Sequence, residues 1–312
     1  MAHTFAVADG IHGIDTLMFG REGATSAYLV EAREPALVET GPTTSLEALL
    51  AGLADLGVGP GDLAHVIVTH IHLDHAGGAG ALAPHFPDAT IWVHERGAPH
   101  LSDPTKLLAS ATRVYGAERL AEMFGSVDPV PAERLRALTD GDVIALGDRR
   151  IEAVYTPGHA SHHVCLFDDR TGGVWVGDAL GVFLPDVRIL RPATPPPEFD
   201  LELAIESIDR VAAREPRMLM FSHFGPATDV GHLCSLAVRR VRKWTAIVEE
   251  ALGQTDDPKE VARILRERTQ TEINPAGART EALEDRYDLL SSIEMNAMGL
   301  SRYLRKRAEA KG

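Results

Sequence analysis

The first third of the chain alternates short β-rich runs with helical repeats of apolar residues. Leucines recur at helical spacing over residues 44–57, where Thr44 and Glu47 fit a capping box. Gly57 suits the end of that helix, and a shorter helix is expected over residues 77–86. The strand candidates, rich in β-branched or aromatic side chains, are residues 25–32, 36–40, 65–70 and 90–94. Strands separated by helices of this size predict a sheet with helices on its outer face.

The middle third has short strands with tight Gly, Asp and Pro turns and no helices between them, which predicts mostly antiparallel pairing. A proline-stiffened loop is expected at residues 193–200. Asp200 is then expected to cap a helix whose apolar face runs from Leu201 to Val211, before one more strand at 217–223. The four middle strand candidates are residues 142–148, 151–157, 162–169 and 173–178.

From Asp229 onward the pattern is helical, over about residues 230–252, 259–268 and 281–306. Amphipathic helices must bury their apolar stripes. They could pack on the rest of the chain, on a second copy in a homodimer, or along one side of a substrate cleft. The apolar candidates are Trp244, Ile247, Val248, Leu252, Leu289, Leu290, Ile293 and Met298. The pattern predicts a main domain over residues 1–228 and a helical region over 229–312.

Composition narrows the class of protein. The 312 residues are 45% hydrophobic and 24% charged, which is typical of a folded globular chain. The formal net charge is −14, the opposite of a nucleic-acid binder's basic footprint. Residues 231–312 carry a net charge of +2 and the remainder −16.

The sequence has neither a transmembrane pattern nor a signal-peptide pattern, and it has two cysteines. No apolar run is long enough to span a bilayer, and the first ten residues lack the basic and apolar regions of a signal peptide. We therefore expect a cytoplasmic protein that binds neither membrane nor nucleic acid. Cys165 and Cys234, the two cysteines, are expected to be buried small hydrophobes.

One stretch, VIVTHIHLDHAGG at residues 66–78, concentrates metal-binding side chains behind a strand. His70 and His72 are two apart, so in extended chain their imidazoles approach a cation from the same side. Asp74 and His75 follow where the chain turns and suit a second cation. Imidazole and carboxylate ligands without thiolate favour zinc, iron or manganese.

Further ligand candidates follow later strands: His159, Asp178 and His223. Seven nitrogen or oxygen ligands at strand ends that could share one sheet edge indicate a metal site far more strongly than one histidine does. An aspartate can bridge two cations, because a carboxylate has two oxygens. The remaining turn histidines are expected to be solvated or hydrogen-bonded: His3, His12, His65, His85, His94, His100 and His232.

These motifs resemble those of the metallo-β-lactamase-fold hydrolases, over about residues 10–228. THIHLDHAGG matches the family's T-H-x-H-x-D-H-x-G-G motif, and TPGHASHH, WVGDAL and FSHFGP match its later motifs in order. The resemblance implies an αββα sandwich, an α/β (α+β) fold, with a dinuclear site at one edge and here a C-terminal helical extension. It implies that His70, His72 and His159 hold one metal, that Asp74, His75 and His223 hold the other, and that Asp178 bridges them.

Two departures from the family pattern stand out. Glu39 occupies the place where the family often has the aspartate of a D-T-G motif. Because its side chain is one methylene longer, a hydrogen bond from this position to a metal ligand cannot be assumed. His162 and His163 follow His159 more closely than in the thioesterase pattern T-P-G-H-T-x-G. These two are candidates for substrate binding, for supporting the ligands, or for plain strand positions.

The expected activity is hydrolysis of an acyl ester or thioester by a metal-bridging hydroxide, in the style of glyoxalase II. Two divalent ions, zinc first with iron or manganese as alternatives, lower the pKa of water from about 15.7 to near neutral. Asp74 would ligate one metal and orient the nucleophile as the catalytic residue, acting on a small-molecule substrate.

Other reactions of the same fold remain open. A lactonase uses the same ligand set. A secreted β-lactamase would need a signal peptide, and a nuclease of the RNase Z type would need a basic face or an inserted exosite. Di-iron redox proteins of this fold typically carry a carboxylate in the place of His72 and a flavodoxin-like domain. A binding or structural protein with an inactive site is a further alternative, which the presence of all seven ligands argues against.

Overall fold

The computed structural model describes residues 3–185, 187–273 and 287–310. Its contacts divide the chain into two compact units, each discontinuous in sequence. The first unit comprises Met1–Tyr155, His162–Gly177 and Arg217–Pro226, and the second comprises Thr156–Ser161, Asp178–Pro216 and Ala227–Gly312. The predicted domain boundary after residue 228 stays a prediction, since these units follow contacts rather than chain order.

The first unit begins with a seven-stranded sheet in sequence order. Strands β1 to β4 pair antiparallel, and β4 to β7 pair parallel. The parallel pairs require crossovers. A helix predicted from the leucine spacing lies in the crossover between β4 and β5, whereas helices that were not predicted lie in the crossover between β6 and β7. The strands are β1 (Thr4–Ala8), β2 (Ile11–Asp15), β3 (Ser26–Val30), β4 (Ala36–Val38), β5 (His65–Ile67), β6 (Thr90–His94) and β7 (Leu135–Leu138).

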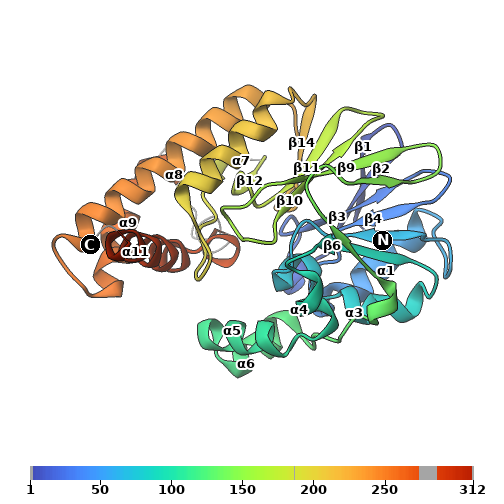
Figure 1. Cartoon of the computed structure of the whole chain (residues 1–312), viewed down its shortest axis with the longest axis horizontal. Helices are drawn as coiled ribbons and strands as arrows, with labels where there is room; N and C mark the ends of the chain where they lie inside the picture. The colour runs from blue at the N-terminus through green and yellow to red at the C-terminus, as the bar shows by residue number, and fades with distance from the viewer. Residues whose placement is uncertain (1–2, 186, 274–286, 311–312) are drawn as a thin grey trace. The chain divides into compact units, whose positions relative to one another are not determined.

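Helices cover one face of this sheet, as the sequence predicts (Figure 1). Leu49 and Leu53 of α1 (Leu46–Asp55) are fully buried there. The predicted capping box is wrong: Ser45 precedes α1 without a side-chain cap, and the Thr44 hydroxyl donates to the Met123 carbonyl instead. A short 3-10 helix, η2 (Thr43–Ser45), precedes α1, and the short elements after β5 are α2 (Leu73–Ala76), α3 (Ala79–Leu82) and η3 (Ala83–His85).

The other face packs against a second, six-stranded sheet. Tyr28 and Val30 of the first sheet share a buried cluster with Val164, Leu166 and Trp175 of the second. Its strands β8 to β11 are antiparallel as predicted, and β14 pairs parallel with β11. They are β8 (Val143–Ala145), β9 (Arg150–Tyr155), β10 (Val164–Asp168), β11 (Gly173–Gly177), β14 (Met218–Phe221) and β15 (Gly225–Ala227).

Between β6 and β7 the chain forms helices that were not predicted from the sequence. None of the residues of α5 is fully buried, although its apolar residues share one face. Leu73 of α2 packs there with Leu120 and Phe124 of α6, and Tyr115 borders this cluster. The elements are α4 (Ala98–Ser102), α5 (Thr105–Tyr115), α6 (Ala117–Phe124) and η4 (Ala132–Arg134), and η1 (Met18–Gly20) follows β2.

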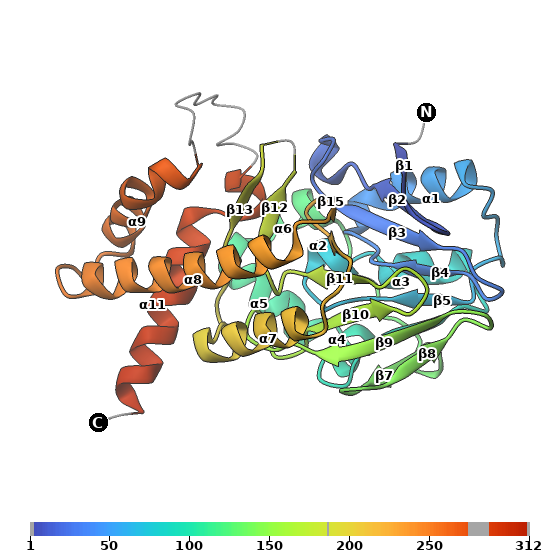
Figure 2. The same cartoon turned by 90° about the horizontal axis from the view of Figure 1, so that it is seen from above.

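The second unit contains a hairpin and the C-terminal helices. Asp200 caps α7 as predicted, accepting from the Leu203 amide at 3.0 Å. The helix α8 has the predicted bounds, and α11 crosses it (Figure 2). The elements are β12 (Val182–Leu184), β13 (Ile189–Arg191), α7 (Leu201–Ala213), α8 (Val230–Leu252), α9 (Pro258–Ile273) and α11 (Ile293–Glu309).

The apolar stripes of these helices form one buried cluster. Trp244, Ile247 and Val248 of α8 meet Ile293 and Leu300 of α11 there. The predicted continuous helix 281–306 is wrong within the described residues, because Ser292 breaks it and caps α11 through the Met295 amide. Residues 281–286 of that prediction lie outside the described residues. Met298 is 47% exposed, so its assignment to the stripe is also wrong.

The mixed α/β fold predicted from the motifs is confirmed. Both cysteines are buried, as expected. In the part of the chain that the structure describes, no helix is long and apolar enough to cross a membrane.

Candidate metal centre

The segment after β5 brings the first two histidines of the motif together. Residues 68–72 have no regular structure, and α2 begins at Leu73. His70 Nε2 lies 3.0 Å from His72 Nδ1. His70 is fully buried, and its ring centroid is 4.0 Å from that of His75. Two ring nitrogens that converge in this way can share one cation, as the two-residue spacing predicts.

Asp74, His75 and His223 form a second group in the first unit. Each can offer one ligand atom, and these atoms lie within 4.8 Å of one another. Asp74 Oδ2 is 3.3 Å from His223 Nε2 and 3.6 Å from His75 Nε2. His75 and His223 are buried, whereas the Asp74 side chain is 25% exposed. Of the three, Asp74 is therefore the one that solvent or a substrate can reach.

Glu39 supports these ligands from behind. Its Oε1 accepts from the Thr69 hydroxyl at 2.5 Å and from the Ser222 hydroxyl at 3.0 Å, and it lies 3.1 Å from His75 Nδ1. Its φ of 67° is in the left-handed region, which is uncommon for a residue with a side chain. The extra methylene that distinguishes Glu39 from the family's aspartate therefore does not prevent the hydrogen bonds expected at this position.

The same carboxylate orients two imidazoles. His75 Nδ1–H donates to Glu39, so His75 Nε2 carries the lone pair that faces Asp74. Thr69 donates its hydroxyl hydrogen to Glu39 and accepts from His70 Nδ1 at 3.0 Å, which leaves His70 Nε2 as the ligand atom. Glu39, His70 and His75 could also hold a cation among themselves. Because Glu39 Oε1 already accepts three hydrogen bonds, we assign Glu39 to orienting the ligands.

His223 is oriented by the backbone. Its Nδ1 lies 3.0 Å from the Ala24 carbonyl oxygen, which can only accept, so Nδ1 carries the proton and Nε2 faces Asp74. The strand β14 ends at Phe221, and Tyr28 donates its hydroxyl to the Phe221 carbonyl. These bonds place His223 at the edge of the second sheet.

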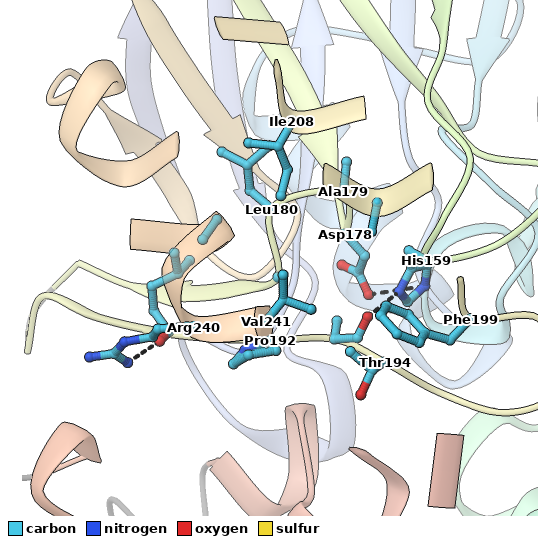
Figure 3. Close-up of a pocket in the computed structure, with 15 residues that line it drawn as sticks. His159, Asp178, Ala179, Leu180, Pro192, Thr194, Phe199, Ile208, Arg240 and Val241 are labelled. Atoms are coloured by element: carbon cyan, nitrogen blue, oxygen red, sulfur yellow. Dashed lines mark hydrogen bonds and ion pairs between the residues drawn. The ribbon is translucent and has the colours of Figure 1, made fainter. Parts of the chain in front are cut away.

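His159 and Asp178 lie together in the second unit. His159 Nδ1 donates to the Ala193 carbonyl at 2.9 Å, and Nε2 lies 3.5 Å from Asp178 Oδ2 (Figure 3). Both side chains are almost fully buried. They line a mostly apolar cavity of about 20 Å³, room for about one water molecule, so this space does not hold a substrate.

Two basic side chains of α8, those of Arg240 and Lys243, have partners within the second unit. Arg240, on the far side of the cavity in Figure 3, donates to the Leu190 carbonyl and contacts Glu272. Lys243 Nζ lies 2.5 Å from Glu272 Oε1. These two cations therefore already have an anionic partner, Glu272, within the second unit.

The two further histidines of TPGHASHH differ in their surroundings. His162 Nδ1 accepts weakly from the Ile71 amide at 3.4 Å, and its ring stacks 6.1 Å from that of His70. His163 is fully buried, and a Cβ on Gly177 would lie 2.5 Å from its Nε2. His162 keeps some exposed surface, so a substrate role stays a prediction that suits it better than His163.

Of the histidines outside the motifs, His12, His65 and His94 are hydrogen-bonded, as expected. His12 contacts Glu31 at 2.9 Å, and His65 contacts Glu34 at 3.2 Å. His94 stacks on Tyr155, and burial lowers its pKa.

Tyr115, at the end of α5, is a residue that the sequence reasoning missed. Burial raises the pKa of its hydroxyl well above the usual range, and the Asp74 charge raises it further. Its ring lies 5.5 Å from that of Phe124. Tyr115 therefore presents a neutral hydroxyl in the neighbourhood of Asp74. The apolar spacing of Leu108, Ala111 and Tyr115 is the signal that could have revealed it.

The donors described here fit divalent metal ions. Buried imidazoles whose far nitrogens are hydrogen-bonded, together with carboxylates and no thiolate, suit zinc, iron or manganese. The first unit alone supplies five such donors: His70, His72, Asp74, His75 and His223.

Comparison with known proteins agrees with this chemistry. The family model described as the metallo-beta-lactamase superfamily matches residues 20–223. The metallo-beta-lactamase fold-containing protein ST1585 of Sulfurisphaera tokodaii is 28% identical over 167 residues, 52% of this chain and 61% of that protein. Its crystal structure aligns with a TM-score of 0.68 at 21% identity, covering 93% of this chain and 98% of that one, which supports the fold.

Two further relatives have names that state a reaction. The probable metallo-hydrolase YqjP of Bacillus subtilis is 26% identical over 252 residues, 74% of this chain and 77% of that protein. The acyl-coenzyme A thioesterase MBLAC2 of Gallus gallus is 33% identical over 129 residues, 40% of this chain and 44% of that protein. Because the matched family model spans well over half of the chain, this protein belongs to the metallo-β-lactamase superfamily and is a metal-dependent hydrolase.

Proposed function

We propose that the protein is a dinuclear metal-dependent hydrolase of acyl thioesters or esters. One metal would be held by His70, His72 and His159, and the other by Asp74, His75 and His223, with Asp178 between them. For His159 and Asp178 the proposal rests on their places in the order of the family's motifs. Zinc is the first choice of metal, with iron or manganese as alternatives.

One observation carries the proposal. In four of the histidines, Nδ1 is hydrogen-bonded to a partner, which leaves Nε2 as the nitrogen that can bind a metal ion. His75 is bound to Glu39, and His70 to Thr69. His223 and His159 are each bound to a backbone carbonyl. Each bond fixes the tautomer and ring orientation, which is how proteins prepare histidine for a metal.

The chemistry divides between the metals and the chain. Divalent ions held there would lower the pKa of water and polarise a carbonyl group. The carboxylate of Asp74, the most exposed member of its group, is placed to accept a hydrogen bond and to orient water. Glu39 holds His75 and, through Thr69, His70, so their rings need not reorganise during the reaction.

An apolar surface beside Asp74 supports an acyl substrate. Leu73, the preceding residue, is buried in the cluster with Leu120 and Phe124. Partly buried side chains border this cluster and could receive an acyl chain: Phe19, Leu107, Leu108, Ala111, Tyr115, Met123 and Val127. The neutral hydroxyl of Tyr115 could donate a hydrogen bond to the carbonyl group. The thioesterase named among the relatives acts on the same bond type.

A substrate panel with metal analysis tests this proposal. Purified protein should contain up to two equivalents of zinc, iron or manganese. It should hydrolyse acyl-CoA thioesters or simple acyl esters faster than lactones, and chelation should abolish the activity. Activity confined to lactones would contradict the substrate class. Reduction of oxygen or peroxide without hydrolysis would contradict the reaction.

A further inference from the structure

The segment that orients His159 is bound to the C-terminal part of the chain. His159 depends on the Ala193 carbonyl for the position of its Nδ1–H. Ala193 lies two residues after β13, at the start of the proline-rich loop, and a free loop would hold this carbonyl poorly. The neighbouring residue, Thr194, is 1% exposed and visible beside His159 in Figure 3.

Asn296 of α11 binds Thr194 through both its backbone and its side chain. Asn296 Oδ1 accepts from the Thr194 amide at 2.9 Å and from the Thr194 hydroxyl at 2.7 Å. Asn296 Nδ2 donates to Ser291 Oγ and to the Ser292 carbonyl, each at 2.9 Å. Asn296 is 2% exposed, so its amide group is held by the protein on both sides.

Further hydrogen bonds join residues 191 and 192, just before this segment, to Ser291, just before α11. Ser291 donates its hydroxyl to the Pro192 carbonyl at 2.7 Å, and Arg191 donates to the Ser291 carbonyl at 3.0 Å. Gly299 lies one turn after Asn296, and a Cβ there would be 1.8 Å from the Thr194 oxygen. The backbone of α11 thus touches the segment directly, and only glycine allows that approach.

We propose that Asn296 is a positioning residue: through Thr194 it holds the Ala193 carbonyl, and through that carbonyl it orients His159 toward a metal ion. This rests on the proposed function, in which His159 is a ligand. It gives the C-terminal helices a role beyond burying their own apolar stripes. Residues that orient a metal-binding histidine typically change metal affinity or activity by 10–100-fold when mutated.

The test measures zinc affinity of the metal-free full-length protein by competition with a chromogenic chelator. Asn296→Ala should bind one of the two equivalents about 10-fold more weakly and leave the other within about 2-fold of wild type. Asn296→Asp keeps both acceptor contacts with Thr194 and should retain more of the affinity. The matched control is Tyr303→Phe, which removes the hydrogen bond from α11 to Glu202 without touching residues 192–194.

Equal zinc affinities in Asn296→Ala and Tyr303→Phe would contradict the positioning role, even if both variants unfold at a lower temperature. If Asn296→Ala does not fold, Thr194→Val decides the matter. It loses only the hydroxyl contact and should weaken the same equivalent roughly 3-fold, as expected for one hydrogen bond. No change there would overturn the proposal. Wild-type protein that takes up no metal contradicts the proposed function instead, so the two failures are distinguishable.

Discussion

The two units orient their candidate ligands by different means. In the first unit the Glu39 carboxylate receives hydrogen bonds from Thr69, Ser222 and His75, and the Ala24 carbonyl orients His223. In the second unit, a backbone carbonyl orients His159, and a helix about a hundred residues later in the chain holds that backbone. Both kinds of support join residues far apart in the sequence, but in the first unit the supporting residue, Glu39, lies in a motif position, whereas Asn296 lies in none.

The largest expected effect comes from removing ligands. His72→Ala and His159→Ala should each lose the same metal equivalent. Activity should fall by more than roughly 100-fold, because loss of a ligand costs more than loss of a residue that only orients a ligand. Since both side chains would serve one ion, the double variant should be little worse than either single variant. Metal analysis and turnover on an acyl thioester check this.

His12→Ala is the matched control, because His12 contacts Glu31 and is not among the proposed ligands. It should keep both metals and wild-type turnover. Loss of different equivalents in His72→Ala and His159→Ala, with additive effects, would show that the two units do not serve one ion.

An intermediate effect is expected for Glu39→Gln. The substitution keeps the shape but removes the negative charge that His75 and Thr69 face. Metal affinity should fall roughly 10–100-fold. Glu34→Gln is the control, since Glu34 contacts His65 and its side chain is 52% exposed. Equal affinities in the two variants, measured by chelator competition, would mean that Glu39 does not support the ligands.

The smallest effect is expected for Tyr115→Phe. Losing one hydrogen bond to the substrate costs about 1 kcal/mol, which is about 5-fold in kcat/KM for an acyl thioester. The high pKa of Tyr115 means that the hydroxyl stays protonated through neutral pH, so the ratio of variant to wild type should not change between about pH 6 and 9. Metal content should be unchanged. A ratio that varies over this pH range, or equal rates, would count against hydrogen-bond donation by Tyr115.

The sequence predicts the elements whose apolar spacing matches their burial. The helix α8 has its predicted bounds because one face is continuously buried, from Leu233 to Ala251. The helix α5 was missed although Leu108, Ala111 and Tyr115 recur at helical spacing, and none of its residues is fully buried. The capping box at Thr44 fails because a carbonyl far along the chain, that of Met123, competes for the hydroxyl.

Some residues of the candidate site could likewise be predicted from the sequence, and others could not. His70, His72, Asp74 and His75 can be found from sequence because they lie within six positions of one another. The hydrogen bonds of Glu39 to His75 and Ser222 could not be predicted, because these partners are 36 and 183 residues away. The role of Asn296 could not be predicted from sequence. Every residue has a backbone carbonyl, so nothing in the sequence marks Ala193 as the partner of His159 or Asn296 as the residue that holds this segment.

The central proposal is that two metal ions bind to the seven residues His70, His72, Asp74, His75, His159, Asp178 and His223. The most direct test is a crystal structure of the zinc-loaded full-length protein with anomalous data at the zinc edge. The account predicts two anomalous peaks, about 3.5–4 Å apart as in other two-metal sites. His159 and Asp178 should bind them together with the first-unit ligands. A single peak held only by first-unit residues, or His159 turned away from both ions, would contradict it.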